Sequence, residues 1–267
     1  MKKRNRFGIF TLVLILSLCG CTQDKIPISS SSDVQKEQDT LPEAEITPEE
    51  EPFLYGYQNL NEEEKTRYRQ ILAGIENYED SVTVEACSEE EINKVSNLVF
   101  VDHPEIFWLE QQNYSFNQKE NSDVDLLELN LVYNMGKDEI EDTKQQIEAK
   151  AEEWSQELSN CENEYDKIKY VYEFLGKNVL YDSESENNQN IQSVFLNQST
   201  VCMGFAKATQ YLLVRNGIFC TLVTGKVIPE NMEHAWNLVR IGENYYYVDT
   251  TWSSSGFVPE EDSIQDF

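Results

Sequence analysis

TVCMGFAKA at residues 200–208 is followed by HAWN at 234–237 and VDTTW at 248–252. The first block begins a stretch with helical spacing over 201–216, for which Ser199 or Thr200 is the expected N-cap and Gly217 the stop signal. The other two blocks lie in β-rich runs over 233–241 and 244–252, and another such run covers 219–227. The pattern predicts one helix followed by three β-strands.

The turn between the last two runs sets their register. Gly242-Glu243 is a Gly-X pair, which is typical of a two-residue type II′ hairpin. The pairing that follows places Trp236 opposite Asp249 and His234 opposite Thr251. His234 and Asp249 are then diagonal neighbours on one face, with α-carbons about 7–8 Å apart. A three-residue loop would shift the register by one and put them on opposite faces.

Cys202 lies in the first turn of the predicted helix, where free N–H groups and the helix dipole lower the pKa of a thiol. A thiol nucleophile needs a base, and the base needs an orienting group. Only His103 and His234 are available as histidines. The order and register therefore predict Cys202, His234 and Asp249 as catalytic residues, whereas Cys220, in a β-run, is expected to be a buried apolar cysteine.

These blocks together resemble the transglutaminase-like family. The resemblance covers about residues 191–252 and implies a papain-like α+β fold, in which a cysteine-bearing helix packs on an antiparallel sheet. It also implies that Cys202 attacks an amide carbonyl, that His234 moves the proton and that Asp249 orients the imidazole. The Cys202 backbone N–H, Gln192 and Gln198 remain alternatives as oxyanion donors.

Two further regions bear on the resemblance. Residues 102–108, DHPEIFW, resemble the region that often precedes this domain in bacterial surface members, which makes His103 structural. Only 15 residues follow Trp252, fewer than family members commonly have. Either the domain closes early or the chain is incomplete.

The N-terminus reads as a targeting segment. Four basic residues precede an apolar run over 7–18, which is shorter than the roughly 20 residues of a membrane-spanning helix. The run ends at Leu18-Cys19-Gly20-Cys21, which resembles the lipobox of bacterial lipoproteins. The resemblance implies lipidation at Cys21 and a protein anchored in the cell membrane through lipid, facing the extracytoplasmic side.

The chain is expected to divide into four parts: a lipoprotein signal peptide (1–20), a disordered acidic linker (21–52), an N-terminal α/β region (53–160) and a transglutaminase-like domain (161–267). Before the cysteine helix, helices are predicted over 60–78, 88–99, 140–158 and 165–179, and strands over 82–86, 106–109 and 126–133.

Composition restricts the partners and cofactors. The formal charge of −28 disfavours nucleic acid, since the chain should repel a phosphate backbone. Six cysteines match no zinc spacing and two histidines cannot build a histidine-rich metal centre, so no metal and no cofactor is expected. Calcium stays open, although the acid runs lie in the linker and lack the spaced ligands of a dedicated loop. A disulfide among Cys87, Cys161 and Cys220 stays open, because the compartment would allow one.

The expected function is an extracytoplasmic acyl-transfer enzyme that acts on peptide or protein amides at the cell surface. Hydrolysis is slightly favoured over amine cross-linking, because water is always available whereas a second amine must be bound. A non-catalytic binding module that retains the fold is the alternative. A solute-binding lipoprotein is a third interpretation, supported only by the anchor.

Overall fold

The computed structural model describes residues 41–110, 116–119, 126–228 and 231–254. The described residues form one compact unit, and the domain boundary expected between 160 and 161 stays a prediction. The helices are α1 (Tyr55–Gln58), α2 (Glu62–Glu76), α3 (Glu89–Asp102), α4 (Lys137–Ser155), α5 (Glu164–Asn178) and α6 (Cys202–Arg215). The strands are β1 (Ser81–Glu85), β2 (Phe116–Lys119), β3 (Leu126–Asn130), β4 (Leu180–Tyr181), β5 (Ser199–Thr200), β6 (Cys220–Val227), β7 (Met232–Ile241) and β8 (Asn244–Val248).

Local capping sets the start of the first long helices. Asn61 caps α2 in a full capping box with Glu64, and three acids occupy the first turn, where the helix dipole favours them. Ser88 caps α3 by accepting from the Glu91 backbone N–H, but the Glu91 carboxylate pairs with Arg67 instead of completing a box. Both helices therefore begin within two residues of the predicted starts.

The N-terminal sheet has the antiparallel order β1-β3-β2 and packs beside α2. The strand predicted over 106–109 is wrong. These residues are buried, but apart from an isolated bridge between Leu109 and Tyr133 they form no ladder. The apolar run is needed to fill the core rather than to extend the sheet, and an apolar run of four residues does not distinguish the two.

Residues 41–52, expected in the linker, are instead folded onto α2. Ala44 is buried and its N–H donates to the Arg69 carbonyl, while the Arg69 guanidinium pairs with Glu43 at 2.7 Å. A turn and a short 3₁₀ helix (Glu51–Phe53) follow. Acidic composition favours disorder only when no partner offsets the charge, and here a basic residue does so. The rest of the predicted linker lies outside the described residues.

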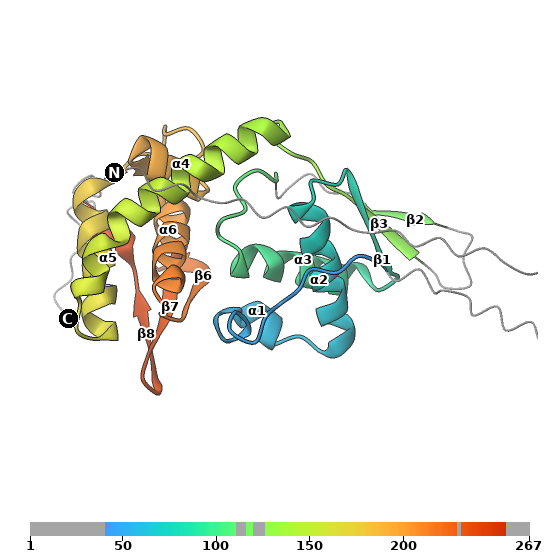
Figure 1. The fold of residues 1–267 in the computed structure, drawn as a ribbon, viewed down its shortest axis with the longest axis horizontal. Helices are drawn as coiled ribbons and strands as arrows, with labels where there is room; N and C mark the ends of the chain where they lie inside the picture. The colour runs from blue at the N-terminus through green and yellow to red at the C-terminus, as the bar shows by residue number, and fades with distance from the viewer. Residues whose placement is uncertain (1–40, 111–115, 120–125, 229–230, 255–267) are drawn as a thin grey trace, which may run out of the picture. The chain divides into compact units, whose positions relative to one another are not determined.

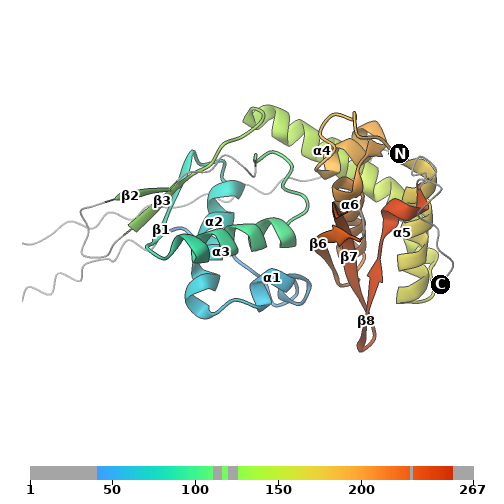
Figure 2. The same cartoon turned by 180° about the vertical axis from the view of Figure 1, so that it is seen from behind.

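The second half of the unit carries α4, α5 and α6 with the antiparallel sheet β6-β7-β8 (Figures 1 and 2). α4 leads from the end of β3 to the neighbourhood of α5 and α6 in both views. α6 packs on β6 and β7 with one face and on α5 with another. This confirms the predicted α+β class, with the cysteine-bearing helix packed on an antiparallel sheet.

The hairpin register agrees with the predicted turn over the whole ladder. Ile241 pairs with Asn244, and the pairing continues to Asn237 opposite Val248. Gly242 has a φ of 59°, which the first position of a type II′ turn requires. The last two predicted pairs do not form, because β8 ends at Val248 and the chain enters a 3₁₀ helix (Thr250–Ser253).

Within the described ranges, no helix is long and apolar enough to cross a membrane. The predicted signal peptide and Cys21 lie outside those ranges.

Candidate active site

Cys202 is the first residue of α6, with its backbone N–H among those that have no carbonyl partner in the helix. The expected cap is wrong: Val201 is the N-cap, and it makes no side-chain capping bond. Thr200 instead donates to the Asn188 carbonyl at 2.9 Å and accepts from Ser193 at 2.7 Å. The first turn of α6 therefore leaves its N–H groups free of a side-chain cap.

His234 links Cys202 to Asp249. Its Nε2 lies 2.7 Å from Asp249 Oδ2, and its imidazole hydrogen-bonds the Cys202 thiol. Since Nε2 is engaged, Nδ1 is the ring nitrogen that is left for the thiol. The structure thus brings together the three residues that the sequence predicts as a triad, although their catalytic roles stay a prediction.

The electrostatics of this group favour an ion pair. Burial would raise the pKa of the Cys202 thiol, but the hydrogen bonds from His234 and from the Ala235 and Met203 backbone N–H groups lower it overall. The bond to Asp249, followed by the bond to Cys202, raises the pKa of His234 to about 9 against the opposing effect of burial. Both shifts favour a thiolate beside an imidazolium over the neutral pair.

Two tryptophans flank the histidine. The Trp236 ring stacks on His234 with centroids 5.9 Å apart, and Trp252 meets it edge-on at 6.4 Å. Trp236 fits because β6 has a glycine beside it: a Cβ at Gly225 would lie 2.6 Å from Trp236 Cη2. Trp252 is 46% exposed, so the histidine is covered by aromatic rings yet lies close to solvent.

Asp249 is fixed by the chain that follows it. It caps the 3₁₀ helix by accepting from the Thr251 N–H at 3.2 Å. Ser253 then donates to the Tyr172 carbonyl of α5 at 3.1 Å, and Ser254 donates to the Val179 carbonyl at 3.0 Å. The carboxylate therefore reaches His234 from a short helix clamped on α5, not from the extended strand that the hairpin arithmetic assumed.

Two buried polar contacts join α6 to β7 and to the 3₁₀ helix that follows Asp249, and neither was predicted from the sequence. Asn237 is fully buried on β7 and donates to the Ala206 carbonyl of α6 at 2.9 Å. Thr209 of α6 and Thr250 share a hydrogen bond of 2.8 Å. Asn237 belongs to the HAWN block and Thr250 to the VDTTW block, so both are polar residues inside apolar runs. Because a buried polar side chain needs a hydrogen-bond partner, this polarity was the signal in the sequence that could have indicated the two contacts.

The other residues singled out from the sequence form no hydrogen bond with the triad in the described part of the chain. Gln192 has a buried side-chain oxygen with no hydrogen-bond partner among the described residues, whereas Gln198 is exposed with a φ of 53°. The structure gives neither a bond to the triad. His103 binds Glu105 through Nδ1 at 2.7 Å, away from Cys202.

The described cysteines, which are Cys87, Cys161, Cys202 and Cys220, are all free thiols. Cys220 is fully buried, as expected, and burial raises its pKa. In the described part of the chain, no cluster of three or more His, Cys, Asp or Glu side chains has the arrangement of a metal site. The geometry at Cys202 is therefore that of a thiol and its base.

Comparison with known proteins agrees with this geometry. Residues 152–250 match the model of the transglutaminase-like superfamily. Kyphoscoliosis peptidase from Mus musculus is 22% identical over 112 residues, which cover 36% of this chain and 17% of that protein. The chain thus spans about a sixth of the length of this curated relative.

Solved structures show weaker likeness. A structure described as a TGase is 15% identical with a TM-score of 0.39, covering 68% of this chain and 53% of that one. The periplasmic domain of TgpA from Pseudomonas aeruginosa, bound to ethylmercury, is 12% identical with a TM-score of 0.33, covering 66% and 72%. The match at residues 152–250 includes Cys202, His234 and Asp249. Residues 152–250 are therefore similar to the transglutaminase-like superfamily.

Proposed function

We propose that the protein is a thiol-dependent acyl-transfer enzyme that acts on peptide or protein amides, with Cys202 as nucleophile. The observation that carries the proposal is the continuous contact from the Cys202 thiol through His234 to Asp249, with the thiol at the start of a helix. A buried structural cysteine would lack a basic partner, as Cys220 does.

The reaction follows from the ion pair. The Cys202 thiolate attacks the amide carbonyl carbon, and the electron pair of the C=O bond moves to oxygen. The imidazolium of His234 gives its proton to the leaving nitrogen as the C–N bond breaks, which leaves a thioester on Cys202. Water or an amine then attacks the thioester, His234 takes the proton, and Cys202 leaves as thiolate. Asp249 holds the imidazole in place throughout.

The developing oxyanion needs donors at the start of α6. The Cys202 backbone N–H is suitably located, since a first-turn N–H has no partner in its helix. Gln192 remains a candidate for the second donor because its amide is partly buried close before α6, and exposed Gln198 remains an alternative. Substitution of each by Ala, with the effect on turnover compared, distinguishes them.

The acyl acceptor decides the reaction type. Water requires no binding site, so we propose hydrolysis as the main outcome and transfer to an amine as the minor one. The protein should be incubated with a glutamine peptide and a labelled amine. Ammonia or peptide fragments without label incorporation support hydrolysis, and incorporated label supports transfer.

Variants separate an enzyme from a binding module that keeps the fold. Cys202→Ala should abolish either product, whereas Cys161→Ala removes another free thiol and should retain the activity. If the wild-type protein forms neither product with a panel of peptide and protein amides while binding one of them, the binding module replaces the enzyme as the function.

We also propose that the protein acts outside the cytoplasm, anchored through a lipid on Cys21. The support is the basic, apolar and Gly20-Cys21 pattern of residues 1–21. Growth with a labelled fatty acid should label the membrane-bound protein, and Cys21→Ser should remove both the label and the membrane association. A labelled Cys21→Ser variant would overturn the anchor.

A further inference from the structure

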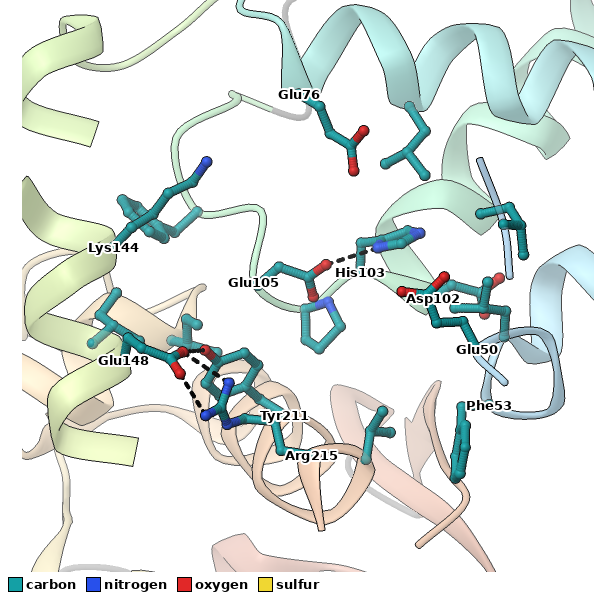
Figure 3. Close-up of a pocket in the computed structure, with 18 of the residues that line it drawn as sticks. Glu50, Phe53, Glu76, Asp102, His103, Glu105, Lys144, Glu148, Tyr211 and Arg215 are labelled. Atoms are coloured by element: carbon teal, nitrogen blue, oxygen red, sulfur yellow. Dashed lines mark hydrogen bonds and ion pairs between the residues drawn. The ribbon is translucent and has the colours of Figure 1, made fainter. Parts of the chain in front are cut away.

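A pocket of about 690 Å³ lies at the end of α6 remote from Cys202 (Figure 3). Its walls come from the segment 45–54, the C-terminal half of α2 with Leu72 and Glu76, the end of α3 and the stretch that follows it to residue 108, the middle of α4, Ile191 and the last turns of α6. Cys202 begins α6 and Arg215 ends it, so the two sites are separated by about 20 Å at 1.5 Å per residue. The pocket is therefore distinct from the proposed active site.

The pocket is strongly acidic. Carboxylates in its wall outnumber the Lys, Arg and His side chains by seven to three. Arg215 is already bound to Glu148 by hydrogen bonds of 2.8 and 2.6 Å, and Lys144 lies over the Trp108 ring with Nζ 3.9 Å from the centroid. The wall cations are thus occupied, and the excess negative charge is left for a ligand.

Several of these carboxylates have no partner. Glu45, Glu49 and Glu76 make no hydrogen bond or ion pair with the described residues, in contrast to Glu105, which binds His103. The pKa of Glu76 is raised, chiefly by desolvation. All three side chains are exposed, so a cation that enters the pocket can reach them.

The remaining wall is apolar and aromatic, with Phe53, Phe107 and Trp108 among its residues. Trp108 is 3% exposed, and its indole N–H has no hydrogen-bond partner among the described residues; His103 Nε2 is also buried without one. These nitrogens suit a ligand that carries acceptor oxygens as well as a cation. Because both are buried, a ligand reaches them only when the covering side chains move.

We propose that this pocket binds a basic side chain of a peptide, Arg or Lys. The unpartnered carboxylates would receive the guanidinium or ammonium group, the aromatic wall would cover the aliphatic stem, and the peptide carbonyl oxygens would accept from the unpartnered N–H donors. A bare metal ion does not fit, because the described residues contain no group of three metal-ligating side chains. The proposal is independent of the reaction at Cys202.

Calorimetric titration of the full chain tests the proposal. A capped tripeptide with central arginine should bind, and its citrulline counterpart, which keeps the shape and loses the charge, should bind at least about tenfold more weakly. Agmatine provides the cation without peptide carbonyls and should bind more weakly than the tripeptide. Equal affinity for arginine and citrulline peptides, or no binding of either, would overturn the proposal, and tighter binding of agmatine would overturn the peptide as the source.

Variants locate the binding. Glu76→Gln should weaken the arginine peptide about fivefold, and the double substitution Glu45→Gln/Glu76→Gln should weaken it further. Glu139→Gln removes an exposed carboxylate of α4 outside the pocket and should have no effect. Cys202→Ala should bind the peptide as the wild type does, so a failure of the proposed enzyme leaves this result unaffected. Unchanged affinity in the double variant would place the peptide elsewhere and overturn the proposal.

Discussion

Substitution of Asp249 by Asn tests whether the triad contact sets the reactivity of Cys202. Asn keeps an oxygen that can accept from the Thr251 N–H, so the cap of the 3₁₀ helix is retained while the charge is lost. The bond to Asp249 is the largest of the influences that raise the pKa of His234 from its ordinary 6.5 to about 9. That rise corresponds to roughly 3 kcal/mol in favour of the imidazolium.

If Asp249 supplies about half of that free energy, Asp249→Asn lowers the pKa of His234 by about one pH unit. The coupling is reciprocal, so a less stable imidazolium raises the pKa of Cys202 in turn. In the wild type the ion pair exists above the lowered thiol pKa and below about 9. In the variant the pKa of the thiol rises and the pKa of His234 falls, so the ion pair exists over a narrower pH range. The fraction of Cys202 present as thiolate near pH 6 then decreases by up to about tenfold.

The assay is alkylation by iodoacetamide from pH 4 to 10, with the Cys202 adduct followed by peptide mass. We expect the wild-type Cys202 to react faster near pH 6 than a model thiol, and the Asp249→Asn rate to rise only at higher pH. Asp138→Asn, on the exposed start of α4, is the control for a lost carboxylate. Superimposable profiles for wild type and Asp249→Asn would refute the ion-pair reasoning.

Three further outcomes concern the scaffold. Asn237→Ala should lower the free energy of unfolding by about 2–3 kcal/mol in urea, because a buried hydrogen-bonded side chain is lost; no loss relative to exposed Asn244→Ala would contradict its anchoring role. Gly225→Ala should displace Trp236, with a changed tryptophan emission and a cost of about 1–3 kcal/mol; an unchanged spectrum and stability would show that the ring is not confined there. Lys207 is 4% exposed, and burial lowers its pKa from 10.5 to about 8. Its positive charge therefore destabilises the folded state fully below pH 8, and this destabilisation disappears above about pH 10.5, where the unfolded chain is also neutral at this residue. Lys207→Met should therefore stabilise the protein by up to about 3 kcal/mol at pH 7, and a gain that persists at pH 10.5 would show that the charge is not the cause.

The hairpin shows how far local rules predict the site. A Gly-X pair between two β-runs determines a turn and hence a register, and the structure follows that register from Ile241 to Asn237. The turn rule does not predict the chain beyond Val248, where tertiary contacts determine its path. Ser253 and Ser254 hydrogen-bond carbonyls at residues 172 and 179, and these bonds draw the chain out of the ladder. The approach of Asp249 to His234 was predicted from the pairing, but its actual route depends on α5.

Composition was a less accurate guide at the start of the folded unit. Low hydrophobicity and high charge predicted disorder through residue 52, yet Arg69 of α2 pairs with Glu43 and the backbone of Ala44 is hydrogen-bonded beside it. The partner is distant in sequence, so no local pattern reveals it. The same limit applies to Asn237, whose carbonyl partner on α6 lies 31 residues earlier.

The serine clamp has a practical consequence for anyone who shortens or tags this protein. The superfamily match ends at residue 250, but Ser253 and Ser254 tie the segment that carries Asp249 to α5. A truncated protein that ends at residue 250 would still contain Cys202, His234 and Asp249. It would lack Ser253 and Ser254, whose hydrogen bonds to α5 hold the segment that carries Asp249. A tag or a domain fusion should therefore be joined beyond residue 254, so that the proposed activity is assayed on a protein in which Asp249 keeps its support.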